Sequence, residues 1–225
     1  GVLCLEFTGK SNSIGEGVGK ALLETIQLVE EGNWKGLVIG NNAKQFSVGA
    51  NLMNIGMFAM QKQFDVLERF VDDFQQINMK IRTSKFPVVV ATQGYVFGGG
   101  CEIAMHCDAG IYAAESYIGL VEVGMGIIPG AGGNLRMLSN VSDNIKTMMP
   151  GSFPIVQKVF ETVGFAKVAT SAKEAKKFSY LRKDDKFIFN RSVLLHEAKN
   201  EVLSMSNNYK APEMRSFKLP GASGR

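Results

Sequence analysis

Three consecutive glycines, followed by a cysteine and a glutamate, stand in the segment FGGGCE, residues 97–102. Because glycine has no β-carbon, a ligand oxygen can come close to the backbone N–H groups of such a run. A short helix is predicted to begin here, and a helix start presents unpaired N–H groups and a positive dipole end. Together with Glu102 in the first turn, the segment indicates an anion or oxyanion site. A structural alternative is that the glycines allow tight helix–sheet packing, with Glu102 as a favourable first-turn acid.

Two further turns of small residues follow predicted strands. The segment LVEVGMGIIPGAGG (120–133) joins Glu122 to a glycine-rich turn, and FSVGANL (46–52) carries a Gly-Ala turn. In parallel sheets, ligands bind beyond the carboxyl ends of the strands. We therefore expect the three turns, two of which bear glutamates, to form one site.

Other reactive residues give weaker patterns. GEGVGKA (15–21) resembles a phosphate loop, but the Ser or Thr that a Walker A motif requires after Lys20 is an alanine, so we interpret the glycines as opening a helix. A second group of candidate metal ligands comprises Cys101, His106, Cys107 and Asp108. Their spacing scatters them around one short helix, and no second Cys/His group lies elsewhere, so no metal site is predicted.

The hydrophobic pattern of the sequence predicts alternating strands and helices, and these elements must position the turns. Short apolar runs predict strands, and apolar residues spaced along one helical face predict helices. The expected elements are a strand at 2–7, a helix at 15–31, a strand at 36–41, a helix at 66–81, a strand at 87–92, a short helix beginning near Cys101 and a strand at 109–114. The unbroken apolar run PVVVAT is typical of a strand buried on both faces. The alternation predicts an α/β fold with parallel strands.

The C-terminal third changes character. From about Ser152 the pattern is helical, with a capping box at Ser171 and Glu174 and an apolar stripe over 192–205. The polar segment SNVSDNIKTMMPGSFP contains two prolines and a glycine and is predicted to be a linker or mobile loop. The expected division is a core at 1–138, the loop at 139–154 and a helical region of the same module at 155–225.

The composition is that of a globular protein, with 45% hydrophobic and 20% charged residues among 225. No apolar run approaches the roughly 18 to 20 residues of a membrane-spanning helix, and the start GVLCLEFTG has no secretory-signal features. Three cysteines favour a reducing compartment, so we expect a cytoplasmic protein. The net charge of +4 is mild and fits ordinary solvated lysines better than a nucleic-acid surface.

Three segments, in the order FSVGANL, FGGGCEIAMHCD and VEVGMGIIPGAGG, resemble the usual blocks of the enoyl-CoA hydratase/isomerase (crotonase) family. Those blocks are F-x-x-G-A-D-L, G-G-G-C-E-L-A and P-E-x-x-x-G-x-x-P-G-x-G-G. The twenty-residue interval from Glu102 to Glu122 is also the family's interval between its two catalytic acids. TSAKEAKKFSYL (170–181) resembles a later family segment, so the likeness covers most of the chain and is densest over 36–137.

The resemblance implies a crotonase-like spiral of ββα units with a helical C-terminal region, assembled as trimers or hexamers. It implies an acyl-CoA thioester substrate that brings coenzyme A with it, and no separate cofactor. By motif position, the N–H groups of Ala50 and Gly99 would form the oxyanion hole, Glu102 would activate the water that attacks C3, and Glu122 would exchange the proton at C2. The other positions expected to bind substrate are Gly49, Asn51, Leu52, Gly98 and Gly130.

The chain departs from the family pattern in three places. Asn51 stands where the family usually has Asp, GKSNSIGEGV (9–18) replaces an N-A-L turn near the CoA pocket, and the stretch between GAGG and TSA is longer. These features most resemble the hydratase module at the C-terminal end of bifunctional 3-hydroxyacyl-CoA dehydrogenases, and the abrupt start at Gly1 fits a module cut from such a chain. No dinucleotide fingerprint is present, so NAD is expected only if a fused dehydrogenase domain exists, against which this module would pack.

The expected function is hydration of a 2-enoyl-CoA in fatty-acid β-oxidation, and two alternatives stay open. A Δ3,Δ2-enoyl-CoA isomerase typically manages with one acid, at the position of Glu122, so the additional Glu102 favours hydration. An RNA-binding relative would use the basic surface, but the chain has one Trp, dispersed charge and no RRM-like stacking motif.

Overall fold

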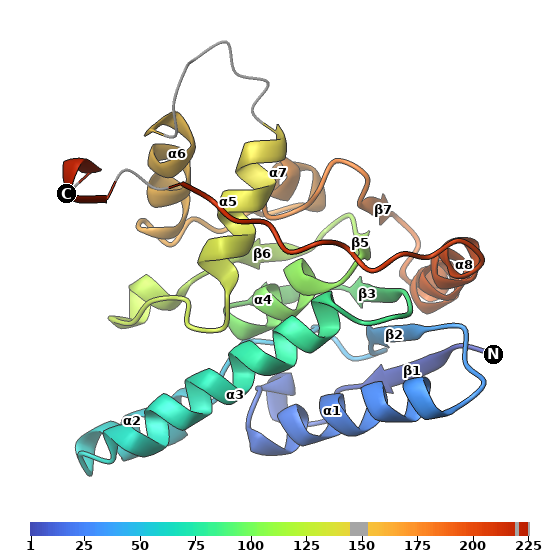
Figure 1. Cartoon of the computed structure of the whole chain (residues 1–225), viewed down its shortest axis with the longest axis horizontal. Coiled ribbons are helices and arrows are strands. Elements are labelled where there is room, and N and C mark those ends of the chain that lie inside the picture. The colour runs from blue at the N-terminus through green and yellow to red at the C-terminus, as the bar shows by residue number, and fades with distance from the viewer. Residues whose placement is uncertain (145–152, 219–220, 225) are drawn as a thin grey trace.

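A parallel sheet of five strands organises the molecule (Figure 1), whose computed structural model describes residues 1–144, 153–218 and 221–224. The strand order is β1 (Leu3–Glu6), β2 (Leu37–Gly40), β3 (Val88–Thr92), β5 (Ala109–Ala113) and β7 (Lys186–Ile188). A second, two-stranded parallel sheet pairs β4 (Tyr95–Phe97) with β6 (Tyr117–Gly119). The predicted α/β class with parallel pairing is therefore confirmed.

Helices cover both faces of the large sheet (Figure 1). They are α1 (Glu16–Glu31), α2 (Leu52–Met60), α3 (Phe64–Arg82), α4 (Gly99–His106), α5 (Gly133–Asn144), α6 (Phe153–Val163), α7 (Ala172–Lys177) and α8 (Leu194–Ser206). Short 3-10 turns lie at Lys10–Asn12, Glu122–Met125, Arg191–Val193 and Gly221–Gly224. The helices predicted at 15–31, 66–81 and 192–205 are present as α1, α3 and α8, with small shifts at their ends.

Strand β3 shows why the sequence there is continuously apolar. Val88 and Val90 point into the core beneath α1, α3 and α4. Val89 and Ala91 point the other way, into a second core that α8 closes with Leu194, Ala198 and Val202. All five β3 residues are buried, because each face of the strand has its own hydrophobic cover.

Two successive chain segments repeat the same ββα path. Strand β3 of the large sheet leads to β4 of the small sheet and then to α4, and β5 leads to β6 and then to α5. Isolated bridges Ser47↔Val96 and Ile118↔Ala169 extend the small sheet on both sides. This is the spiral arrangement expected from the family resemblance.

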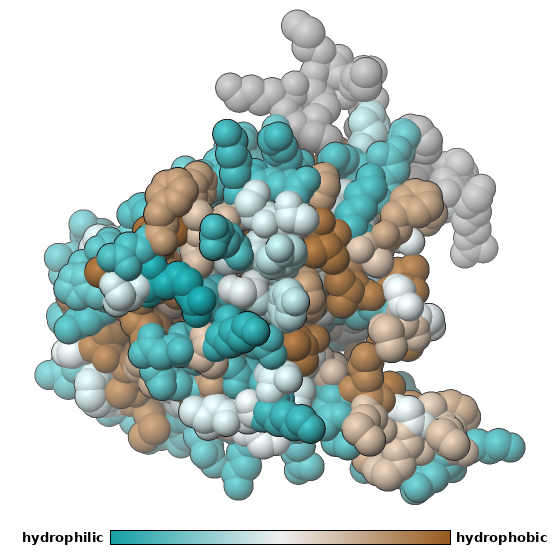
Figure 2. Space-filling model, turned by 180° about the vertical axis from the view of Figure 1, so that it is seen from behind, coloured by the Kyte–Doolittle hydropathy of each residue, from teal (hydrophilic) through white to brown (hydrophobic). Residues whose placement is uncertain are grey.

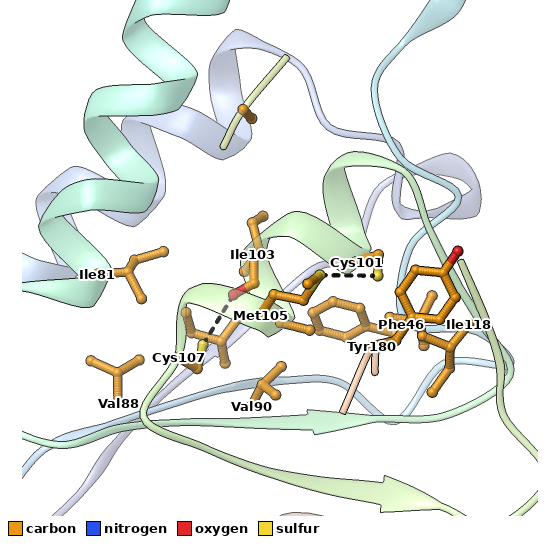
Figure 3. Close-up of a cluster of buried hydrophobic side chains, with 14 of the residues drawn as sticks. Phe46, Ile81, Val88, Val90, Cys101, Ile103, Met105, Cys107, Ile118 and Tyr180 are labelled. Atoms are coloured by element: carbon orange, nitrogen blue, oxygen red, sulfur yellow. Dashed lines mark hydrogen bonds between the residues drawn. The ribbon is translucent and has the colours of Figure 1, made fainter. Parts of the chain in front are cut away.

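The core beneath α4 fixes the start of that helix in place (Figure 3). Cys101 and Met105 contact each other through sulfur at 3.8 Å, and the Cys107 thiol donates to the carbonyl of Ile103 at 3.4 Å. Tyr180, from the C-terminal region, packs in the same cluster. Because every residue of α4 is buried, the glycines at its first turn have little freedom to move.

The sequence pattern did not predict three short strands. β4, β6 and β7 each contain three residues, too few to show a period of two. Helix α4, predicted to begin near Cys101, begins two residues earlier at Gly99, with Gly98 between it and β4. The C-terminal region is not purely helical either, because β7 adds the last strand of the large sheet.

The predicted loop at 139–154 was wrong in its first part. Helix α5 continues through Asn144, and Ser139, Asn140 and Val141 on it are buried. The side-chain N–H of Asn140 donates to the carbonyl of Ser179 at 3.0 Å, whereas its buried Oδ1 has no partner among the described residues. A polar sequence is thus accommodated within a packed helix. Residues 145–152, the rest of that prediction apart from the start of α6, lie outside the described residues.

Of the two hydrogen bonds that define the capping box predicted at α7, one is present. The Ser171 hydroxyl accepts from the N–H of Glu174 at 3.2 Å, as predicted. The Glu174 carboxylate instead accepts from the N–H and hydroxyl of Thr170, one residue earlier than the motif expects. Among the described helices, none combines the length and apolarity that a bilayer crossing needs.

Candidate active site

The three glycine-rich turns meet beside the small sheet. The Ser47↔Val96 bridge sets the first turn next to β4, and β4 pairs with β6, which leads into the third turn. The N–H of Gly98 donates to the carbonyl of Gly119 at 3.0 Å, which ties the second turn to the end of β6. Segments 46–52, 97–102 and 120–133 therefore form one site.

A cavity of about 100 Å³ opens between these turns, α2 and α3. Eight of the nine site residues expected from the sequence line it: Gly49, Ala50, Leu52, Gly98, Gly99, Glu102, Glu122 and Gly130. Most of the remaining lining is apolar and comes from α3 and the third turn, including Phe70, Phe74, Met125, Ile127 and Ile128. Apolar surface gathers around the indentation between the α2 end and the rest of the molecule (Figure 2).

Asn51 is the expected site residue that does not line this cavity. Its side-chain oxygen accepts from the N–H groups of Met53 and Asn54, at 3.1 and 3.4 Å, and caps the start of α2. The expectation that Asn51 binds substrate is therefore not supported by its position. An aspartate performs the same cap chemistry, which explains how either residue type fits here.

Glycine is required where the first two turns touch. Gly49 and Gly98 have positive φ angles of +93° and +52°. A β-carbon on Gly49 would lie 2.9 Å from the carbonyl oxygen of Phe97 and 3.3 Å from the nitrogen of Gly99. A β-carbon on Gly98 would lie 3.2 Å from Oε1 of Glu122. The two backbones thus approach as closely as glycine permits, beside a carboxylate.

Two backbone donors at this contact are unused. Within the described residues, neither the N–H of Ala50 nor that of Gly99 donates to another protein group. Gly99 is the first residue of α4, where the helix leaves its N–H groups without internal partners. Both residues line the cavity, so an oxygen atom bound there would lie within reach of two free donors.

Glu102 is held rigidly at the base of the cavity. Its side chain is buried, and Oε1 accepts from the N–H groups of Ala131 at 2.9 Å and Gly133 at 2.8 Å. Burial raises the pKa of this carboxyl to about 7, although the two N–H bonds oppose the shift. Glu102 therefore holds its proton to a higher pH than an exposed carboxyl does.

Glu122 faces the same cavity from the opposite turn. Burial, and then the charge of Glu102, raise its pKa to about 7. Among the described residues, no protein group donates to its buried Oε2. The two carboxyls interact, so their titrations belong to the pair rather than to either residue.

Two polar side chains of α3 donate hydrogen bonds to the turn whose N–H groups contact Glu102. The sequence analysis did not predict this role for either residue. Gln75 donates to the carbonyl of Gly130 at 2.6 Å, and buried Asn78 donates to the carbonyl of Ala131 at 2.9 Å. The Gly130 carbonyl and the Ala131 N–H belong to one peptide group, so Gln75 polarises a donor to Glu102. Both residues lie on a helix predicted only for its apolar face, and no local motif marks them.

The other reactive residues have separate roles. Lys20 in GEGVGKA lies on the exposed face of α1, 3.8 Å from Glu24. Cys101 and Cys107 pack in the core beneath α4, and within the described residues no group of three His, Cys, Asp or Glu side chains is arranged to hold a metal ion. His106 is buried behind the third turn, and its Nδ1 donates to the carbonyl of Glu102 at 2.7 Å.

The sequence was compared with models of known protein families. The family model of enoyl-CoA hydratase/isomerase matches residues 1–149, which include all three turns and both glutamates. The chain belongs to this family. The matched range contains Ala50, Gly99, Glu102 and Glu122.

Curated family relatives cover the chain to different extents. A probable 3-hydroxyacyl-CoA dehydrogenase of Bacillus subtilis (strain 168) is 38% identical over 99% of this chain. A mitochondrial enoyl-CoA hydratase of Pongo abelii is 30% identical over 66% of this chain, and a 2,3-dehydroadipyl-CoA hydratase of Escherichia coli (strain K12) is 31% identical over 50%. In turn, the chain spans only 28%, 50% and 42% of these relatives, respectively.

Solved structures of the family share the fold. An enoyl-CoA hydratase from Bacillus anthracis superposes with a TM-score of 0.73 at 23% identity, covering 92% of this chain and 73% of that one. An enoyl-CoA hydratase from Polaromonas sp. JS666 gives 0.75 at 18% identity, covering 90% and 73%. The chain therefore has the crotonase fold over nearly its whole length.

Proposed function

We propose that this chain is an enoyl-CoA hydratase, a hydro-lyase that adds water across the 2,3 double bond of a 2-enoyl-CoA thioester. The observation that carries the proposal is the pairing of two carboxyls, the buried Glu102 and the partly buried Glu122, with unused N–H donors in one largely apolar cavity. The family membership and the names of the hydratase relatives support it.

In the proposed reaction, the thioester oxygen accepts from the N–H groups of Ala50 and Gly99. Glu102 takes a proton from water as the water oxygen bonds to C3, and the π electrons move onto the thioester as an enolate. Fixed donors stabilise that charge, each worth roughly 100- to 1,000-fold in rate by analogy with other oxyanion holes. Glu122 then delivers a proton to C2, and the net change is the addition of one water molecule.

The apolar surroundings fit the acyl chain of such a substrate. Phe70, Phe74 and Ile128 line the cavity, and the rim is apolar where Met125 and Ile127 are exposed. Coenzyme A enters as part of the substrate, and the balanced reaction uses no other cofactor. The acyl-chain length that the site prefers is open to direct assay.

A second part of the proposal concerns the longer context. The 38% identity to a probable 3-hydroxyacyl-CoA dehydrogenase, of which this chain spans 28%, supports a hydratase module of a bifunctional β-oxidation enzyme, with NAD used by the fused domain alone. A packing surface against that domain, or against other copies in a trimer or hexamer, is supported by the α2 end, where Met53 and Met60 are 85% and 88% exposed. Free thiols at Cys4, Cys101 and Cys107 support a cytoplasmic location.

The test is direct. The purified chain is mixed with crotonyl-CoA and, separately, with a longer 2-enoyl-CoA, and the absorbance of the conjugated thioester is followed. We expect the absorbance to fall with formation of the 3-hydroxyacyl-CoA, as identified by mass. No water addition with either substrate, from protein shown to be folded by circular dichroism, would reject the proposal. Conversion of a 3-enoyl-CoA without hydration of a 2-enoyl-CoA would instead identify an isomerase.

A further inference from the structure

Two side chains of α4 pack against the glycines of the third turn. Glu102 and His106 are four residues apart, so they are neighbours on the surface of the helix. A β-carbon on Gly133 would lie 2.8 Å from Oε1 and 2.9 Å from Cγ of Glu102. A β-carbon on Gly132 would lie 3.0 Å from both Cε1 and Nε2 of His106. The turn is therefore in close contact with the carboxylate at Gly133 and with the imidazole ring at Gly132.

The residues on either side of Gly132 supply both backbone donors to Glu102. The nitrogens of Ala131 and Gly133 lie 2.9 and 2.8 Å from Oε1 of Glu102. Gly132 itself has a φ of +96°, a conformation that favours glycine. Because both N–H groups converge on one oxygen, a rotation of the backbone at Gly132 would move at least one of them away from it.

The ring of His106 is fixed at the junction of α4 and α5. The side chain is 1% exposed, and its Nδ1–H donates to the carbonyl of Glu102 at 2.7 Å. From α5, Arg136 donates through Nε to the carbonyl of Met105 at 3.1 Å, directly before His106. A buried ring that is bonded to its own helix has little freedom to turn away from Gly132.

The ring is neutral in this position. Burial lowers the pKa of the His106 imidazole to about 3, although its hydrogen bond opposes the shift. The charges of Arg136, Arg82 and Arg182 lower it as well. With the single proton on Nδ1, Nε2 carries no hydrogen toward Gly132. Nε2 has no hydrogen-bond partner among the described residues, so the ring contacts Gly132 through its shape.

We propose that His106 is a positioning residue for Glu102, an inference that rests on the hydratase function proposed above. The ring supports the backbone at Gly132 and thereby keeps the N–H groups of Ala131 and Gly133 directed at Oε1. Without the ring edge, the turn relaxes into the vacated space and the bonds to the carboxylate weaken. His106 lies two residues beyond the family block that ends at Ala104, so no motif marks it.

This role has a consequence for the acidity of Glu102. The bonds from Gly133 and Ala131 oppose the effect of burial on the pKa of that carboxyl. Weaker bonds would therefore raise its pKa further. A merely structural role of His106 would lower the stability of the protein and leave this titration unchanged, so the pKa of Glu102 separates the two roles.

His106→Asn is the test variant. The amide nitrogen of asparagine can take the place of Nδ1 and keep the bond to the Glu102 carbonyl. The residue lacks the ring atoms Cε1 and Nε2, which are the atoms that face Gly132. The matched control is His196→Asn, at the other histidine of the chain, which is exposed on α8.

The carboxyl of Glu102 is titrated by ¹³C NMR without substrate, in protein labelled at the glutamate carboxyls. Glu122 shares the cavity and its titration is coupled, so all proteins compared carry Glu122→Gln. Additional replacement of Glu102 by Gln identifies its signal. We expect His106→Asn to raise the pKa of Glu102 by roughly half a unit or more, because part of a charge-assisted hydrogen bond is lost, and His196→Asn to leave it unchanged. An unchanged or lower pKa in folded His106→Asn protein would overturn the proposal.

A second variant covers a failure to fold. If circular dichroism shows that His106→Asn is unfolded, Gly132→Ala takes its place, because the new β-carbon pushes against the same ring atoms from the other side. The same rise is expected, and its absence would overturn the proposal. The titration contains no substrate, so it is independent of activity. A chain that fails to hydrate crotonyl-CoA would reject the proposed function, whereas the pKa of Glu102 alone decides the role of His106.

Discussion

Glu102 and Glu122 share one cavity but have different contacts. Oε1 of Glu102 accepts two backbone N–H bonds, which favour its charged form, whereas Oε2 of Glu122 has no protein donor within the described residues. Backbone N–H groups of Val121 and Glu122 also favour charged Glu122, but the charge of Glu102 raises the pKa of Glu122. When the pair holds one proton, that charge favours Glu102 as the carboxylate and Glu122 as the acid. That division agrees with the proposed roles, a base for water and a proton donor for C2.

Replacing either acid with glutamine is expected to reduce hydration of crotonyl-CoA by roughly 100-fold or more, because the amide keeps the shape but cannot move the proton. The double variant should be little worse than either single variant, since groups that act as a unit are not additive. Steady-state hydration kinetics provide the measurement. A Glu102→Gln protein that hydrates at the wild-type rate would contradict the hydratase assignment.

The same two variants separate hydration from isomerisation. Glu122→Gln should lose conversion of a 3-enoyl-CoA, while Glu102→Gln is expected to keep some of it, because one acid at the position of Glu122 handles proton exchange at carbon. Product analysis by mass and absorbance distinguishes the two reactions.

Gly98 should be intolerant of even a methyl group. Its φ of +52° is rare for residues with a side chain, and the new β-carbon would lie 3.2 Å from Oε1 of Glu122. Gly98→Ala is expected to cost about 1–3 kcal/mol of strain and to lower kcat/KM for crotonyl-CoA by more than tenfold. Gly56→Ala, where a β-carbon meets nothing within 4 Å, is the matched control and should stay active. Similar activity in the two variants would argue against a tightly built turn.

At the scale of elements, α3 connects the core to the active site. Its buried face carries Phe74, Ile77 and Ile81 into the core, while Gln75 and Asn78 reach the carbonyls of the third turn. The helix thereby orients the two N–H groups that contact Glu102. Gln75, the neighbour of the cavity-lining Phe74, thus contacts the peptide group whose N–H donates to Glu102.

Gln75→Leu is predicted to raise the pKa of Glu102, because the Ala131 peptide loses polarisation and donates a weaker bond. If cooperativity changes a charged hydrogen bond by 10–30%, the acid limb of kcat/KM against pH shifts upward by roughly 0.1–0.6 units. Gln76→Leu, whose side chain donates to Asp72 on the exposed face, is the control. Coincident acid limbs in the wild type and both variants would exclude this linkage.

For the whole molecule, burying Glu102 has a cost that depends on pH. The pKa of Glu102 is about 7 in the folded protein and exceeds the ordinary value of 4.5. Between pH 4.5 and pH 7, this carboxyl therefore binds more protons in the folded protein than in the unfolded chain. The contribution of this group to the free energy of unfolding therefore decreases as pH rises through the window, by about 3 kcal/mol in total. His106 acts in the opposite direction between about pH 3 and 6.5, because its pKa is lowered.

Glu102→Gln should remove the Glu102 contribution and leave that of His106. The difference in unfolding free energy, variant minus wild type, is therefore expected to grow by about 3 kcal/mol from pH 4.5 to pH 8. Urea denaturation at several pH values measures this difference. Parallel stability curves for the two proteins would show that the buried carboxyl does not titrate as described.

Local sequence alone determined the features whose cause lies within a few residues. An unbroken apolar run predicted β3, and apolar residues along one helical face predicted α1, α3 and α8. The glycine-rich turns with their glutamates indicated the region of the site. The family resemblance then named Ala50 and Gly99 as donors, and eight of the nine expected residues do line one cavity.

Tertiary structure decided what depends on distant partners. Strands of three residues form only because a neighbouring strand supplies hydrogen bonds, as β6 does for β4. Asn51 caps a helix instead of lining the cavity, and residues 139–144 continue α5, where the side-chain N–H of Asn140 donates to a carbonyl 39 residues away. Glu102 meets N–H donors 29 and 31 residues away, and Gln75 reaches a carbonyl 55 residues away. Periodicity reports only which side of an element is buried, so it carries no record of these contacts.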